Sequence, residues 1–74
     1  MSEHLPALSG KECVQVFLSN GWAVSRQRGS HIILRKAGFP RGLCVPNHKV
    51  LDKGTLASLI RQAGLTPQEF RNLL

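Results

Sequence analysis

The sequence has few acidic residues, few cysteines and no long apolar run. Only four Asp and Glu residues stand against ten Lys and Arg residues, so the formal net charge of the 74 residues is +6. Such an excess on a small surface favours an anionic partner, and nucleic acid is the first candidate. The basic residues do not follow the pattern of an amphipathic helix, which argues against binding to a membrane surface.

Signals for targeting are also missing from the sequence. No apolar run approaches the roughly 18 residues that a membrane-spanning helix needs. The segment from Met1 to His4 lacks the basic and apolar regions of a secretion signal. We therefore expect a cytoplasmic protein.

The small number of cysteines and acids argues against several kinds of site. Cys13 and Cys44 are not spaced like the ligands of a zinc knuckle, and three histidines and four acids form no local cluster. No glycine-rich loop resembles a nucleotide-phosphate motif. We expect no metal and no cofactor, and we expect both cysteines to be reduced and to serve as small apolar side chains.

Helix signals lie at the two ends of the chain. Ser9 and Glu12 have the spacing of a capping box, and the apolar residues around Phe17 predict a helix over residues 10–20. Apolar residues at positions i, i+3, i+4 and i+7 predict a second helix over residues 55–63. A second capping box, with proline at the first helical position, predicts a short last helix near the C-terminus.

Strand signals lie between the helices. Residues 22–27 and 30–35 read as two strands joined by a tight turn at residues 28–29. Residues 36–41 carry the glycine and proline of a longer connection, and residues 43–45 form a third strand. The sequence thus predicts a single α+β domain over the whole chain, with element order α-β-β-β-α, a three-stranded antiparallel sheet and a short C-terminal helix.

Alternation along the second strand predicts which residues face solvent. Ile32 and Leu34 share one face, whereas His31, Ile33 and Arg35 share the other. The two main helices need an apolar surface to pack on, so we expect them both to cover the face of Ile32 and Leu34. The opposite face, which we call the open face, then presents an imidazole and part of the positive charge.

One imidazole lies among arginines in the stretch from Arg26 to His31. Arginines can hold the phosphates of a polyanion and an imidazole can move protons near neutral pH, which together suffice to cut RNA without a metal. Attack of a 2′-hydroxyl on the adjacent phosphate needs a base and donors that stabilise charge on the phosphate. His31 is the candidate base, and Arg28 is the candidate donor.

Other polar residues are candidates for contacts with an RNA backbone. Ser30 alternates away from His31, although its backbone amide can still reach a phosphate. His48, in a polar loop, is a minor candidate for a second proton-transfer group. The candidate RNA-binding residues are Arg26, Arg28, Ser30, Arg35, Lys36 and Lys49.

Together these motifs resemble the HicA-type toxins, the RNA-cleaving half of a bacterial toxin–antitoxin pair. The resemblance covers roughly residues 5–74 and implies a double-stranded-RNA-binding-domain-like fold. It also implies a metal-independent endoribonuclease, or mRNA interferase, in which His31 is catalytic, and a cognate HicB-type antitoxin that covers the active face. The motifs are Ser9-Gly10-Lys11-Glu12, Arg26-Gln27-Arg28-Gly29-Ser30-His31, Val45-Pro46-Asn47-His48-Lys49, Gly54-Thr55-Leu56 and Arg61-Gln62-Ala63-Gly64-Leu65-Thr66.

Two other functions fit the same residues. A non-catalytic module could recognise the shape of helical RNA through its basic side chains. A protein-interaction domain could use its charge to attract an acidic partner.

Overall fold

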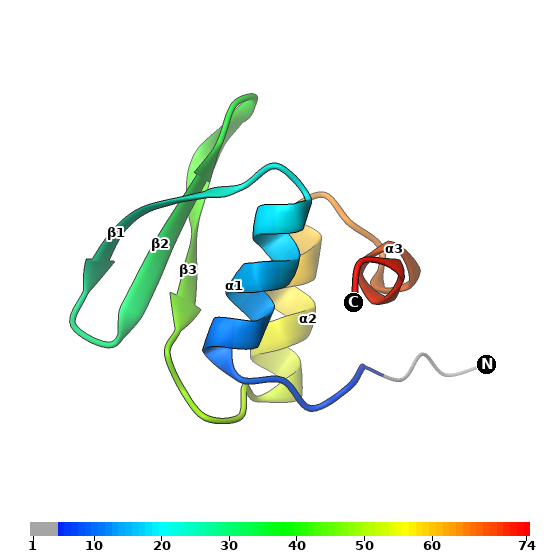
Figure 1. Ribbon diagram of the computed structural model, residues 1–74. Coiled ribbons are helices and arrows are strands. Elements are labelled where there is room, and N and C mark those ends of the chain that lie inside the picture. The colour runs from blue at the N-terminus through cyan, green and yellow to red at the C-terminus, as the bar shows by residue number, and fades with distance from the viewer. Residues whose placement is uncertain (1–4) are drawn as a thin grey trace.

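The computed structural model describes residues 5–74 and contains three helices and three strands within that range (Figure 1). The predicted order α-β-β-β-α with a short C-terminal helix is confirmed. Residues 1–4, whose sequence lacks the features of a secretion signal, lie outside the described residues. The elements are α1 (Gly10–Ser19), β1 (Ala23–Arg28), β2 (His31–Lys36), β3 (Phe39–Pro46), α2 (Lys53–Gln62) and α3 (Pro67–Asn72).

Side-chain caps fix where the two main helices begin. The Ser9 hydroxyl accepts a hydrogen bond from the Glu12 amide at 3.0 Å, and the Glu12 carboxylate accepts one from the Ser9 amide at 2.9 Å, as the capping box predicts. α2 begins two residues earlier than predicted, because Asp52 is its cap and accepts from the Thr55 amide at 3.2 Å. Within residues 5–74, no helix is long and apolar enough to cross a membrane.

The first hairpin joins β1 and β2 through a two-residue turn. Arg28 lies opposite His31, so only Gly29 and Ser30 make the turn. Gly29 has φ +57°, a left-handed conformation that glycine adopts without steric cost. Ser30 therefore belongs to the turn and not to the second strand, where the sequence had placed it.

The second hairpin corrects the predicted connection over residues 36–41. Lys36 lies opposite Phe39, so the turn contains only Ala37 and Gly38, and β3 begins four residues earlier than predicted. Gly38 has φ +87° and supplies the left-handed residue of the turn. Pro40 fits in β3 because β3 is an edge strand, in which a missing backbone donor leaves no partner unpaired.

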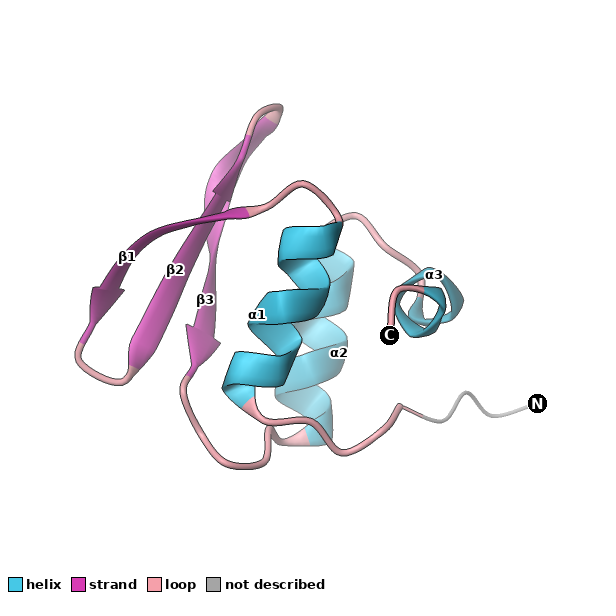
Figure 2. Cartoon of the chain, in the orientation of Figure 1, coloured by secondary structure: helices cyan, strands magenta, loops and turns pink. Residues whose placement is uncertain are grey.

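The three strands form one antiparallel sheet in the order β1-β2-β3, and α1 and α2 pack against a single face of it (Figure 2). The predicted division of β2 is confirmed, because Leu34 is completely buried while His31 and Arg35 are exposed. On the covered face the Trp22 ring packs edge-on against Phe17, with 6.5 Å between ring centroids. The largest fully buried side chains are Phe17, Phe70, Leu34, Leu43, Leu56, Ile60, Val45 and Cys13.

The two cysteines lie in different environments. Cys13 is fully buried on the inner face of α1, as expected, but Cys44 is exposed. The expectation that Cys44 serves as an apolar packing residue is therefore wrong. Its position follows from the register, because Cys44 is paired with Ile33 and side chains of paired residues share a face.

β1 differs from the other two strands because none of its six residues is buried. It is an edge strand, and Figure 1 shows it on the side of the sheet away from α2. A register shift between Val24 and Arg26 makes Ser25 an extra residue in the pairing with β2. Such a bulge reverses the alternation of side chains beyond it.

Candidate active site

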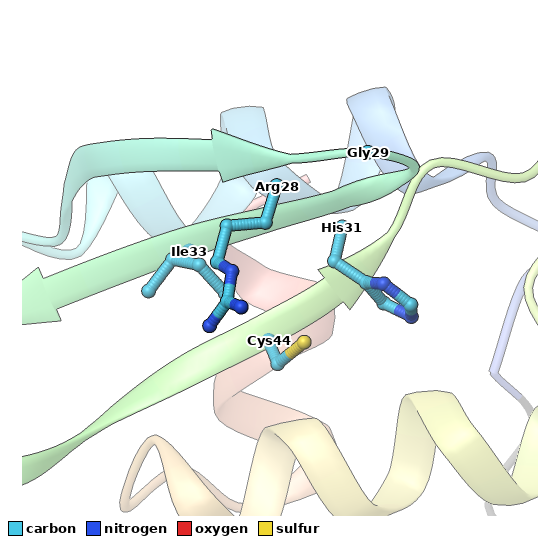
Figure 3. A pocket seen from close by; sticks show the side chains of 5 residues that line it. All are labelled: Arg28, Gly29, His31, Ile33 and Cys44. Atoms are coloured by element: carbon cyan, nitrogen blue, oxygen red, sulfur yellow. The ribbon is translucent and has the colours of Figure 1, made fainter.

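His31 is the first residue of β2 and lies on the open face beside the first turn. Arg28 is its partner on β1, and Pro46 is its partner on β3. Figure 3 shows the side chains of Arg28, His31, Ile33 and Cys44 on the same face of the sheet. With Gly29, these residues line an open hollow of about 450 Å³. The structure therefore places an imidazole and a guanidinium at one accessible site.

The bulge at Ser25 brings the β1 arginines to this face. Val24 lies opposite Leu34 on the covered face, so regular alternation would also turn Arg26 and Arg28 toward the helices. Because Ser25 is the extra residue, Arg26 instead lies opposite Ile33, and Arg28 lies opposite His31. Within residues 5–74, the guanidinium groups of Arg26 and Arg28 form no hydrogen bond or ion pair with another residue. Both groups are available to a phosphate.

Arg35 extends the positive charge of the open face toward β3. A Cβ added to Gly42 would lie 3.4 Å from Arg35 Nε and 3.5 Å from its Cδ, so the Arg35 side chain lies across Gly42. The same Cβ would come within 2.7 Å of the Leu34 carbonyl oxygen. Gly42 therefore leaves space for β2 and for the arginine above it.

Lys36 is separated from the other candidates. Its ammonium donates a hydrogen bond of 2.7 Å to the Asn20 carbonyl, at the C-terminal end of α1, and lies 5.4 Å from the centre of the Phe39 ring. It is five residues along β2 from His31, roughly 16 Å at the usual rise of a strand. The structure gives Lys36 a structural partner, away from the hollow.

Ser30 and Lys49 lie beside the hollow but do not line it. The Ser30 carbonyl accepts a hydrogen bond of 2.7 Å from the Asn47 amide, which ties the first turn to the loop between β3 and α2. In that loop His48 and Lys49 line a smaller hollow of about 210 Å³, together with Ser9, Lys11 and Asn47. An RNA contact at Lys49, or proton transfer by His48, would thus occur at a neighbouring surface.

The cysteine positions bear on the chemistry of the site. Burial raises the pKa of the Cys13 thiol to about 12, so it stays protonated and unreactive. Cys44, which we had not proposed for the site, lines the hollow with His31. Alternation along β3 does predict this side of the sheet, because it directs Cys44 away from the face of Leu43 and Val45. Among residues 5–74, no three His, Cys, Asp or Glu side chains come together as a metal site.

Comparison with known proteins decides the family. The family described as the HicA toxin of bacterial toxin–antitoxin systems matches residues 10–65. The chain belongs to this family. The HicA match includes all three strands and therefore every residue that lines the hollow of His31.

A solved structure supports the same assignment. One chain of a toxin–antitoxin complex from Streptococcus pneumoniae has 36% sequence identity and a TM-score of 0.71 to this HicA-family chain. The alignment covers 78% of this chain and 98% of that chain. A search of curated proteins finds no match. The resemblance inferred from the sequence motifs and the predicted fold are both confirmed.

Proposed function

We propose that this HicA-family toxin is an endoribonuclease that cleaves mRNA without a metal ion, with His31 as general acid and base. The observation that carries the proposal is the pairing of His31 with Arg28 across the first hairpin, in an open hollow. The site offers a proton acceptor and a fixed cation, both exposed and close enough to meet at one phosphodiester. Acting on mRNA, the enzyme would work in the cytoplasm.

Each of these two side chains has a defined part in the reaction. Neutral His31 takes the proton of a ribose 2′-hydroxyl, whose oxygen then attacks the adjacent phosphorus. The guanidinium of Arg28 stabilises the negative charge that develops on the phosphate oxygens. The imidazolium then returns its proton to the departing 5′-oxygen. The products are a 2′,3′-cyclic phosphate and a free 5′-hydroxyl, so no external reactant is consumed.

The other arginines of the open face position the RNA. Arg26 and Arg35 flank the hollow and can neutralise phosphates on either side of the one that reacts. Ser30 and Lys49 extend this surface along the first turn and the loop after β3. Since these contacts are electrostatic, RNA affinity should fall steeply as the salt concentration rises.

An antitoxin of the HicB type would inhibit the enzyme by covering the open face. A similar chain belongs to a toxin–antitoxin complex, which supports a protein partner for this chain as well. Ile33 supports this binding position for the antitoxin, because it is a half-buried apolar residue that lines the hollow beside His31. A partner that covers Ile33 would also cover His31.

The test is cleavage of a long single-stranded RNA in the presence of EDTA. We expect the natural chain to cut, and we expect His31→Ala to reduce the rate by at least about 100-fold, the usual contribution of a general base. RNA affinity, measured by gel shift, should change less than about threefold, since the imidazole carries little of the binding charge. His48→Ala is the matched control and reports whether the neighbouring hollow takes part.

Intact RNA with the natural chain, together with a salt-sensitive gel shift, would reject the enzyme and support a non-catalytic RNA-binding module. Absence of RNA affinity at low salt would reject both and favour a protein-interaction domain. Equal cleavage by the natural chain and His31→Ala would remove His31 from the mechanism.

A further inference from the structure

A second hollow lies on the other side of β1, between α1 and the first hairpin. It has a volume of about 350 Å³, and we call it the α1–β1 groove. Seven residues line it: Lys11, Glu12, Val14 and Gln15 of α1, Val24 and Gln27 of β1, and Ile32 of β2. The surface of this groove is mainly apolar, with Val14, Val24 and Ile32 among polar neighbours, whereas the hollow of His31 presents polar and apolar surface in similar amounts.

Val24 is exposed although it lies on the covered face. It is paired with Leu34, which is completely buried, yet 52% of the Val24 surface is accessible to solvent. The helices cover Leu34 completely but leave about half of Val24 exposed, so the apolar surface continues past the edge of the core. An exposed apolar surface next to a charged active face is typical of a binding site for a protein.

We propose that the α1–β1 groove binds an apolar side chain from an acidic segment of the antitoxin, so that the antitoxin grips β1 from both faces. This inference rests on the proposed function, because it extends the interface beyond the open face. β1 makes such a grip possible, since it is an edge strand with no buried residue. A partner that covers the open face reaches the groove by passing over a single strand.

Charge distinguishes the antitoxin from the other possible occupants. RNA binds mainly through its phosphates, and the groove offers them a mainly apolar surface with one cation, Lys11, beside the acid Glu12. A second copy of this chain would bring another net charge of +6 against the first. An acidic segment is attracted by the same charge and can pair with Lys11 at the rim. Glu12 also lines the groove, but its carboxylate accepts a hydrogen bond from the Ser9 amide in the capping box of α1, which leaves Lys11 as the cation for an acidic segment.

Val24→Glu tests the apolar contact. The full chain is co-expressed with its cognate HicB-type antitoxin, and affinity is measured after purification and separation of the two. We expect Val24→Glu to bind at least about 30-fold more weakly, the ratio for loss of an interface hot spot. Val50→Glu is the matched control, because Val50 is 64% exposed and does not line the groove, and its affinity should stay within about twofold.

RNA cleavage by the same variants separates the possible occupants. Both variants should cleave RNA like the natural chain, since neither valine lines the hollow of His31. Reduced cleavage by folded Val24→Glu would place RNA in the groove and overturn the proposal. Normal antitoxin affinity of Val24→Glu would also overturn it, while leaving the proposed function intact. If the natural chain neither cuts RNA nor binds the antitoxin, the proposed function itself fails.

A charge reversal at the rim provides a second test that does not depend on Val24→Glu folding. Lys11→Glu should weaken antitoxin binding about tenfold, because it repels the acidic segment. Lys53→Glu makes the same change in net charge at the start of α2, away from the groove, and should weaken binding less than about threefold. Equal losses of antitoxin affinity for Lys11→Glu and Lys53→Glu would mean that only the net charge attracts the antitoxin. That result would overturn the contact between Lys11 and an acidic segment.

Discussion

The two faces of the sheet differ sharply although they are built from the same strands. On β2 the fully buried Leu34 lies next in sequence to the exposed Arg35. On β3 the fully buried Val45 follows the exposed Cys44. One face supplies apolar contacts to α1 and α2, and the other presents arginines and an imidazole to solvent. A single step along a strand therefore separates residues that stabilise the fold from residues proposed to act on RNA.

The largest expected contrast is between Leu34→Ala and His31→Ala. Leu34→Ala should lower the free energy of unfolding by about 3 kcal/mol, because it leaves a cavity in the core. His31→Ala should change it by less than about 0.5 kcal/mol, since His31 is exposed. Urea unfolding of both variants checks the stabilities, and RNA cleavage should show the reverse order of effects. Similar stability losses would contradict the separation of the faces.

Gly10→Ala should lower both stability and RNA cleavage, although Gly10 lies on the covered side of the sheet. Gly10 begins α1, its amide donates to the His48 carbonyl at 2.9 Å, and a Cβ there would collide with the Pro46 carbonyl oxygen. Pro46 is the β3 partner of His31, so a change beneath the sheet is transmitted to the active site. We expect a loss of about 2 kcal/mol in the free energy of unfolding and several-fold slower RNA cleavage.

Gly54→Ala is the control for Gly10→Ala. A Cβ at Gly54 would approach only the Asp52 carboxylate, at 3.1 Å, which a shift of a few tenths of an ångström relieves, whereas Gly10 meets backbone atoms that cannot give way. Its stability should therefore change less than that of Gly10→Ala in the same urea titration. Equal stabilities of Gly10→Ala and the natural chain would show that α1 can shift without cost.

The pH dependence of stability should report the buried thiol. Burial raises the pKa of Cys13 from the ordinary value of 9.0 to about 12, so the unfolded chain loses this proton at lower pH than the folded chain. The stabilisation is complete below pH 9 and is lost as the pH rises toward 12. Between pH 8 and pH 10 the expected loss is about 1.4 kcal/mol.

Urea titrations at both pH values measure the Cys13 effect. Cys13→Ala should lose less stability over this interval than the natural chain, because it lacks the titrating thiol. Cys44→Ala removes the exposed thiol of the other face and serves as the control. The same pH dependence in Cys13→Ala and the natural chain would rule out the buried thiol as the cause.

The smallest contrast is between two neighbouring cations, Lys36 and Arg35. Lys36→Met removes the hydrogen bond to the Asn20 carbonyl and should lower the free energy of unfolding by about 1 kcal/mol, with RNA affinity unchanged. Arg35→Met should leave stability unchanged and weaken RNA binding, with a salt dependence reduced by about one phosphate contact. A gel shift at several salt concentrations measures the second effect. Weaker RNA binding by Lys36→Met would show that Lys36 contacts RNA after all.

The sequence predicted the fold well where local signals act alone. The Ser9–Glu12 capping box fixed the start of α1, and alternation from His31 to Arg35 assigned the faces of β2. The start of β3 was not predicted, because Gly38 and Pro40 are typical of a loop. Their strand pairing depends on a two-residue turn and on β3 lying at the edge of the sheet, and both depend on tertiary structure.

Within the candidate site, the arginines were harder to place than the histidine. The bulge at Ser25 turns Arg26 and Arg28 to the open face, and nothing in the local sequence identifies the extra residue. Lys36 could have been placed, since it alternates with Ile32 and Leu34 on the covered face. The α1–β1 groove could not be predicted, because it depends on how far α1 extends over β1.

The absence of buried side chains in β1 has a consequence for how the family can diversify. Substitutions at exposed positions usually change stability by less than about 0.5 kcal/mol. The β1 positions outside the proposed active site, such as Val24 and Gln27, can therefore vary while the core remains intact, and with the proposed grip on β1 a compensating change in the antitoxin would restore the fit. Two related toxin–antitoxin pairs in one cell could thus stop recognising each other's partners through substitutions in β1 alone, while each toxin still folds.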